Sequence, residues 1–408
     1  MRRYMMIIFL FTFLVGGCQS SERKDSISGE TSLFEETADN LFMTEEYLPD
    51  YDAQNQFSRY KDAAIVDNII YFKCGTNMCF YDMNTETASF LCDKPECTHS
   101  TGSCNAYFQD LCGLCYYNQK IYWVEKNENH YYLVSMNLDG SDHTRVQELP
   151  EPFMFYEYSA AMRIHRGYVY MAEVLNEVEI GQSYNRLVLA RVKLGEEKSE
   201  PETIIDKKGD AITGYDFYMN FWGNTMYFLE RDYITEGNNR GIVSMLYTYD
   251  IHTTEAEKIS KEFYASETPS DLLVTEDGIF VSMYYYEDSS ENRFYDKRVL
   301  QFNLESEEWM ELAEIPFLET GDPMLLENNL LAASWGWDTP RSLIADYEGN
   351  IIRTCNFPLS ETQTNVSVYP LIATEEYVIF DLKPIGEGTE SIILVPLDPE
   401  EELQILCS

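Results

Sequence analysis

Seven of the ten cysteines lie between positions 74 and 115, together with His99. Four of these residues follow the spacing Cys92-x4-Cys97-x-His99-x4-Cys104. Three thiolates and one imidazole form a complete tetrahedral set for Zn²⁺, although this spacing is looser than the common Cys-x2-Cys pair. The carboxylate arrangement that zinc hydrolases require is absent from the motif, so a bound metal is expected to be structural rather than catalytic.

The same thiols have a second interpretation as disulfides. An exported protein in an oxidising compartment uses cysteines in this way, and an insertion without a core of its own needs such crosslinks to fold. Cys74 can pair with Cys79 across a tight hairpin, and the thiols at 92, 97 and 104 can pair with Cys112 or Cys115, but spacing does not give the connectivity. Free thiols are the third interpretation.

Aromatic side chains stand beside carboxylates at two further places. Tyr284, Tyr285 and Tyr286 precede Glu287 and Asp288, and the second place is Trp335-Gly336-Trp337-Asp338. Flat apolar rings with acceptors at their edge suit the binding of a sugar or a peptide. The alternative is that these rings pack between neighbouring sheets, as aromatic residues of strands usually do.

The elements that carry these residues recur along the chain. Seven apolar pairs, each preceded by a turn signal, are spaced by 48 to 57 residues: Ile70-Tyr71, Ile121-Tyr122, Val169-Tyr170, Met226-Tyr227, Ile279-Phe280, Leu330-Leu331 and Val378-Ile379. Each unit reads as four short strands rich in β-branched and aromatic residues, bounded by Asn, Asp, Gly or Ser. This pattern predicts an all-β fold, a seven-bladed β-propeller of four-stranded antiparallel blades over residues 41–408. An extra strand at Leu41 to Tyr47 that seals the ring remains an alternative.

Propeller geometry assigns the loops to faces. Loops between second and third strands lie on the same face as the links between blades, so the aromatic segments and a Cys-rich insertion, residues 92–111, are expected on one face. The insertion is expected near the junction of the first two blades. Cys355 and Cys407 fall on the outermost strands of neighbouring blades. Such strands do not bring Cα atoms within about 7 Å, so both cysteines are predicted to be unpaired.

The N-terminal residues predict export and lipidation. Two arginines precede a short apolar run, and the sequence Leu14-Val15-Gly16-Gly17-Cys18 resembles a bacterial lipobox. Residues 1–17 would then be a lipoprotein signal peptide, Cys18 the acylated first residue, and 18–40, rich in Ser, Glu, Asp and Thr, a disordered tether. Asp50 to Asn55 begins like a calcium loop but lacks the glycine of that loop, so a solvated linker is predicted.

The charge balance restricts the partners. Asp and Glu number 70 against 29 Lys and Arg, which gives a formal net charge of -41. Nucleic acid is therefore excluded as a partner, because its phosphates require basic side chains. Cations, cationic partners and neutral sugars stay open.

One unit resembles a known family. Ile121-Tyr122-Trp123-Val124, followed by Asn137-Leu138-Asp139-Gly140-Ser141, is similar to a blade of the YWTD propellers of low-density-lipoprotein receptors and of their bacterial relatives with TolB-like blades. Val124 and Glu125 replace the Thr and Asp of that motif, and the family has six blades. The whole chain resembles clostridial surface lipoproteins that combine a lipobox, a propeller and a Cys-x4-Cys-x-His-x4-Cys segment. The resemblance implies the fold and a location at the cell surface or in the periplasm.

These observations predict a membrane-anchored, non-catalytic binding or scaffolding module for a glycan, a peptide or an envelope protein, with no cofactor other than a structural zinc. The alternative is a glycoside hydrolase or polysaccharide lyase with carboxylates or tyrosines at the central channel. A Gly-x-Ser-x-Gly elbow, a His-Glu-x-x-His pair and a phosphate-binding glycine loop are all missing from the sequence, which favours the binding module.

Overall fold

The computed structural model describes residues 47–52 and 63–407, with breaks at 101, 109–110, 129, 152, 154–160, 180–181, 197–199, 209–214, 237–238, 260–266, 286–295, 316–322, 337–338, 359–364 and 386–388. The lipobox, Cys18 and the tether lie outside the described residues, as do positions 41–46 of the alternative extra strand. In the part of the chain that is described, no helix is both long and apolar enough to cross a membrane.

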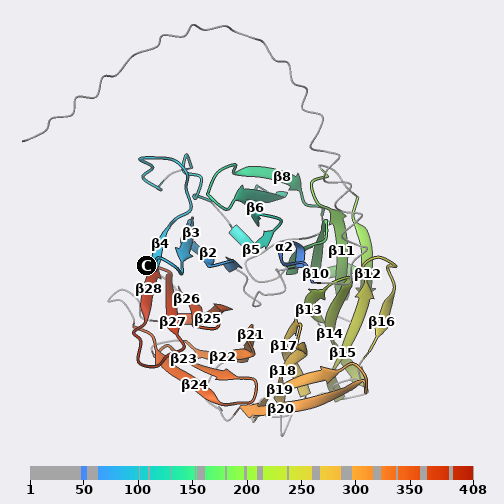
Figure 1. Cartoon of the computed structure of the whole chain (residues 1–408). Coiled ribbons are helices and arrows are strands. Elements are labelled where there is room, and N and C mark those ends of the chain that lie inside the picture. The colour runs from blue at the N-terminus through green and yellow to red at the C-terminus, as the bar shows by residue number, and fades with distance from the viewer. Residues whose placement is uncertain are drawn as a thin grey trace, which may run out of the picture.

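Seven four-stranded antiparallel sheets form a ring, which confirms the predicted seven-bladed propeller (Figure 1). Blades 1 and 2 contain β1 (Ala63–Val66), β2 (Ile69–Cys74), β3 (Asn77–Asp82), β4 (Thr87–Phe90), β5 (Leu111–Tyr117), β6 (Lys120–Asn127), β7 (His130–Asn137) and β8 (Thr144–Glu148). Blades 3 and 4 contain β9 (Ala161–His165), β10 (Tyr168–Glu179), β11 (Gln182–Lys193), β12 (Glu202–Lys208), β13 (Tyr215–Trp222), β14 (Thr225–Glu236), β15 (Asn239–Asp250) and β16 (Ala256–Lys258). Blades 5 to 7 contain β17 (Glu267–Thr275), β18 (Gly278–Tyr285), β19 (Asp296–Asn303), β20 (Glu308–Ile315), β21 (Pro323–Leu326), β22 (Leu330–Trp335), β23 (Arg341–Asp346), β24 (Ile351–Asn356), β25 (Val366–Ala373), β26 (Tyr377–Pro384), β27 (Ser391–Pro396) and β28 (Gln404–Cys407).

The turn signals of the sequence are the hairpin turns of the structure. Asn118 and Gln119 join β5 to β6 with φ of 44° and 62°, and Arg166 and Gly167 join β9 to β10 with φ of 43° and 85°. Positive φ at both central residues is the type I′ geometry, whose twist matches that of the flanking strands. These turns set the register that points alternate side chains toward the neighbouring blades.

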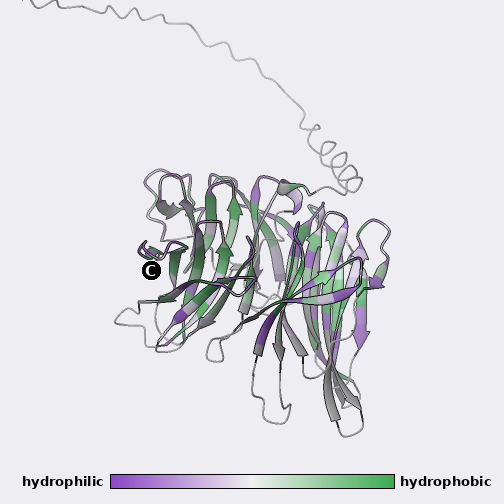
Figure 2. Cartoon of the chain, turned by 60° about the horizontal axis from the view of Figure 1, so that its bottom comes forward, coloured by the Kyte–Doolittle hydropathy of each residue, from purple (hydrophilic) through white to green (hydrophobic). Residues whose placement is uncertain are grey.

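The hydrophobic core lies between the blades. The largest buried cluster runs through four adjacent blades, from Ile379 and Leu394 of blade 7 through Trp123 of blade 2 to Val169 of blade 3. Burial falls toward the circumference: every residue of β27 is buried, whereas every residue of the outermost β4 and β16 is exposed. Hydrophobic residues accordingly follow the strands and hydrophilic ones collect in the turns (Figure 2). Packing between blades is therefore the main source of stability.

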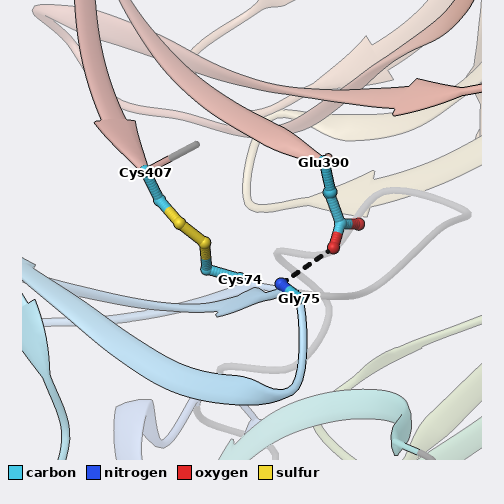
Figure 3. Close-up of a disulfide and its surroundings, with 4 residues drawn as sticks. All are labelled: Cys74, Gly75, Glu390 and Cys407. Atoms are coloured by element: carbon cyan, nitrogen blue, oxygen red, sulfur yellow. Dashed lines mark hydrogen bonds between the residues drawn. A yellow bond between two sulfur atoms is a disulfide. The ribbon is translucent and has the colours of Figure 1, made fainter. Parts of the chain in front are cut away.

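A disulfide closes the ring. Cys74 at the end of β2 is bonded to Cys407 at the end of β28, with their Cα atoms 6.4 Å apart, and the Gly75 N–H donates to Glu390 Oε2 at 3.0 Å beside it (Figure 3). Each described sheet is built from four consecutive strands, so no strand is exchanged between the first and last blades among them. Closure therefore rests on blade packing and this bond.

The short helix α2 (Pro49–Asp52) lies inside the ring, where it packs against β5 and β9 (Figure 1). Asp52 is completely buried and accepts from Arg166 Nε at 3.0 Å and Nη2 at 2.8 Å. The solvated linker predicted at Asp50 to Asn55 is therefore wrong for Asp52, because a buried guanidinium requires a carboxylate. Burial lowers the pKa of neighbouring His165 to about 4, although Asp52 opposes this.

Candidate metal centre

The Cys-rich insertion lies at the junction of blades 1 and 2, as predicted, but at the circumference of the ring. Figure 1 shows this segment, which follows β4, beside the outer strands β4 and β8. The insertion ends one residue before its predicted boundary, because Leu111 already belongs to β5. Outer strands of a propeller are strongly twisted, so the end of β4 points toward the next blade rather than along the channel.

Backbone hydrogen bonds fix both ends of the insertion to blade 1. The Leu91 N–H donates to the Met78 carbonyl at 2.9 Å, and the Met78 N–H donates to the Ala106 carbonyl at 2.8 Å. A third bond runs from the Phe108 N–H to the Thr76 carbonyl at 3.0 Å. Leu91, Ala106 and Phe108 are buried and join the core of the blades. The insertion therefore has an apolar base that packs on blade 1, and its fold does not depend on crosslinks alone.

Four side chains converge above this base. One ligand atom from each of Cys92, Cys97, His99 and Cys104 lies within 4.8 Å of every other, and His99 Nδ1 lies 3.3 Å from Cys104 Sγ. Ligand atoms about 2.0–2.3 Å from one tetrahedral Zn²⁺ are roughly 3.3–3.8 Å apart. The set therefore needs to contract by about 1 Å at most to hold a zinc ion. Cys104 is buried and the other three are half-buried, so the site is largely closed by protein.

Interactions around the ligands hold them in place. The ring of His99 stacks on Phe90 with centroids 4.7 Å apart, and His99 itself has a left-handed φ of 55°. Asn105, next to Cys104, donates through Nδ2 to Asp93 Oδ1 at 2.6 Å and to the Gly140 carbonyl at 3.0 Å. Such outer contacts orient metal ligands before the ion arrives.

Blade 2 approaches the cluster through Gly140, in the turn between β7 and β8. Gly140 has a φ of 82°, and a Cβ placed on it would lie 2.8 Å from the Leu91 carbonyl carbon and 2.9 Å from the Cys92 nitrogen. Only glycine fits this contact. The His143 ring, three residues further on, lies 3.1 Å from the Asn105 carbonyl. The cluster therefore lies between blades 1 and 2, and the segment that carries it contacts both.

The thiols of the cluster differ in acidity when no metal is bound. Burial opposes ionisation of Cys92, but hydrogen bonds from the N–H groups of Lys94 and Asn105 outweigh it, and the pKa of this thiol lies below its ordinary value. Burial raises the pKa of Cys104 to about 11. A metal ion would have to displace the proton of Cys104 on binding.

The remaining cysteines correct part of the prediction. Cys407 is not unpaired and Cys74 does not pair with Cys79, because ring closure places β28 next to β2. Cys79 and Cys115 are free and buried, and belong neither to the metal set nor to a disulfide. Burial raises the pKa of both thiols to about 12, so they are unreactive. Cys355 is unpaired, as predicted. Cys112 lies on β5, and its side chain is outside the described ones.

The aromatic segments begin where two strands end. Tyr284 and Tyr285 end β18, and Trp335 ends β22, on the side of the second-to-third-strand loops, but their side chains are not among those described. Tyr286, Trp337 and Asp338 fall outside the described residues. Whether these residues form a binding rim stays a prediction.

Comparisons with known proteins show the fold. No protein-family model and no curated protein matches the chain. Among solved structures, prolyl oligopeptidase B from Galerina marginata is similar over 93% of this chain and 54% of its own, with 8% identity and a TM-score of 0.51. Oligogalacturonate lyase from Vibrio parahaemolyticus is similar over 86% of this chain and 90% of its own, with 15% identity and a TM-score of 0.48. Acylaminoacyl peptidase from Pyrococcus horikoshii is similar over 88% and 54%, with 10% identity and a TM-score of 0.47. This chain thus spans about half the length of the two peptidases.

Proposed function

We propose that this protein is a lipid-anchored, extracytoplasmic propeller that acts as a non-catalytic binding or scaffolding module for a glycan, a peptide or an envelope protein, with a structural zinc ion in the Cys-rich insertion. The observation that carries the zinc part of the proposal is the convergence of Cys92, Cys97, His99 and Cys104. Four protein ligands complete a tetrahedral sphere and leave no position for a reacting water, so this is the donor set of a structural site.

The zinc ion would crosslink the insertion, which itself contacts both blades. Metal analysis and intact mass of the chain purified without reductant test this part. We expect about one zinc per chain, and loss of that zinc in Cys97→Ala. Cys355→Ala is the matched control, because Cys355 is a buried, unpaired thiol in blade 6, and it should keep the metal. Absence of zinc together with oxidised pairs among the thiols at 92, 97 and 104 would contradict the assignment.

The Cys74–Cys407 disulfide supports export, because such bonds persist in oxidising compartments. The lipid anchor is tested by fractionation of cells that express the chain or its Cys18→Ser variant. The unaltered chain should sediment with membranes and the variant should not. Equal distribution of the two would remove the anchor from the proposal, while the propeller and the zinc site would be unaffected.

The binding role is tested with a screen of glycans and peptides against the purified chain. Trp335→Ala and Trp337→Ala should weaken binding of any ligand found, by tenfold or more if the indole rings form the contact. Unchanged affinity in both variants would remove these residues from the site. Turnover of a glycan that disappears on changing one carboxylate of the central channel would instead favour the enzyme.

A further inference from the structure

Three arginine side chains are buried in the part of the chain that is described, and two of them have a carboxylate partner. Arg166 is paired with Asp52 at 2.8 Å, and Arg191 is paired with Glu202 at 2.7 Å. Arg163 is only 4% exposed, yet it forms no ion pair with any residue of the chain that the structure describes. Its buried Nε also has no hydrogen-bond acceptor. Arg163 is therefore a buried cation whose counter-charge has to be identified.

Arg163 lies on β9, the innermost strand of blade 3, which contacts α2 inside the ring. Its Cα is paired with that of Tyr170 on β10, so the two side chains lie on the same face of the sheet. Tyr170 packs in the core between blades 3 and 4, together with Met219 and Phe221. The Arg163 side chain therefore lies on the face that packs against blade 4, and its Nη1 donates to the carbonyl of Met162, in its own strand, at 3.0 Å.

Asp271, on the innermost strand β17 of blade 5, is the carboxylate whose charge acts on this guanidinium group without touching it. Its oxygens accept from the backbone, Oδ1 from the Leu272 N–H and Oδ2 from the Leu325 N–H, each at 3.0 Å. Burial lowers the pKa of Arg163 to about 9, although Asp271 opposes this, so the guanidinium group is charged at neutral pH. Asp271 therefore reduces the cost of this charge from a distance and leaves Nε without an acceptor.

A buried charge without a partner in contact is strongly destabilising, and a buried donor without an acceptor adds to that cost. A water molecule would accept from Nε but would not compensate the charge. An anion does both, because hydrogen bonds between a guanidinium group and an anion are charge-assisted. Since Arg163 is only 4% exposed, the anion has to be small, and it can enter through a local opening of the structure.

We propose that Arg163 binds a chloride ion on the face of blade 3 that packs against blade 4, and that Nε donates to this ion. The chloride ion would supply the counter-charge that Asp52 and Glu202 supply to the other two buried arginines. The ion would stabilise the packing of blade 3 against blade 4 near the centre of the ring. Neither the aromatic segments nor the zinc centre takes part, so this proposal and the proposed function can each fail without the other.

Thermal unfolding of the purified chain in mixtures of sodium chloride and sodium gluconate tests the proposal. The total salt is held at about 0.5 M, so that the field of the acidic chain is screened equally throughout. An increase of chloride from about 5 to 500 mM should raise the melting temperature by about 2 °C relative to Arg163→Met, which should lack the specific response. Arg145→Met is the matched control, because Arg145 is an exposed arginine of β8, and it should respond as the unaltered chain does. General effects of the two salts on the protein surface are common to all three proteins.

Arg163→Met replaces a buried charge with an apolar side chain of similar length, so it should fold, and at low chloride it should melt at or above the temperature of the unaltered chain. Crystals soaked in sodium bromide give a second readout: one anomalous peak should lie in hydrogen-bond contact with Arg163 Nε. The proposal is overturned if the unaltered chain and Arg163→Met respond equally to chloride. It is also overturned if the bromide-soaked crystals show a water molecule and no anomalous peak at Nε.

Discussion

Removal of the Cys74–Cys407 disulfide should cost this propeller more than removal of a typical disulfide. The bond joins residues separated by 333 positions, which is nearly the whole folded chain. Loop-closure entropy for a loop of this length gives a ceiling of about 6 kcal/mol at 25 °C, and measured losses for native disulfides are about 2–5 kcal/mol. We therefore expect a loss at the upper end of this range, about 4–5 kcal/mol in the free energy of unfolding.

Urea unfolding of Cys74→Ser, Cys407→Ser and the double variant measures this loss. Because either change breaks the same bond, the three variants should lose nearly the same free energy, rather than the double variant losing the sum. The dependence of that free energy on urea should also steepen, since the unbonded unfolded chain exposes more surface. Cys355→Ser controls for placing a hydroxyl at a buried thiol. Additive losses in the double variant, or an unchanged slope in all three, would refute the reasoning.

Three further predictions concern positions where the contacts in the structure determine how much stability is lost on substitution or on a change of pH. Gly140→Ala should destabilise the chain by about 2–4 kcal/mol and reduce its zinc content, whereas Gly195→Ala, with the same φ of 82° but open space around it, should cost only about 1 kcal/mol; thermal unfolding and metal analysis measure both. Asp52→Asn should cost about 3–5 kcal/mol, because it leaves a buried arginine without its carboxylate, and Asp142→Asn, in an exposed pair with Lys120, should cost less than about 1 kcal/mol in the same urea experiment. His165 is neutral and buried, and its pKa is about 4, against about 6.5 in the unfolded chain. Its contribution to the free energy of unfolding is therefore complete above pH 6.5, and about 3 kcal/mol of it is lost as the pH falls to 4. The difference in stability between the unaltered chain and His165→Gln should shrink over that range, and a constant difference would contradict it.

The fold could be predicted because its information is local. Turn pairs such as Asn118-Gln119 and Arg166-Gly167 stand one residue before an apolar pair, and such turn signals recur at the spacing that one blade requires. Every blade is formed by four consecutive strands, so no long-range pairing had to be known. The grouping of Cys92, Cys97, His99 and Cys104 was predictable for the same reason, since the four residues lie within one short segment, although their spacing left disulfides and free thiols open beside a metal.

The features that the sequence does not predict depend on ring closure and on burial by residues that are far away in the sequence. Cys407 was compared with Cys355 in the preceding blade, but its neighbour across the closure is Cys74, at the other end of the folded chain. Asp52 is predicted to lie in a linker because the calcium-loop pattern is incomplete there, while Arg166, the partner that buries it, lies 114 positions further along the chain.

The position of the closing disulfide also orders events during synthesis. The chain emerges from its N-terminus, and because each described blade uses consecutive strands, a blade can complete its sheet before the next has been made. Cys74 emerges 333 residues before its partner, however, and meanwhile the thiols at 79, 92, 97, 104, 112 and 115 appear close behind it in the sequence. The correct bond therefore requires those nearer thiols to be withdrawn first, by burial, as at Cys79 in β3 and Cys115 in β5, or by the metal ligation proposed for the insertion. When β28 has been made, Cys407 can then react with far fewer free thiols than the sequence contains.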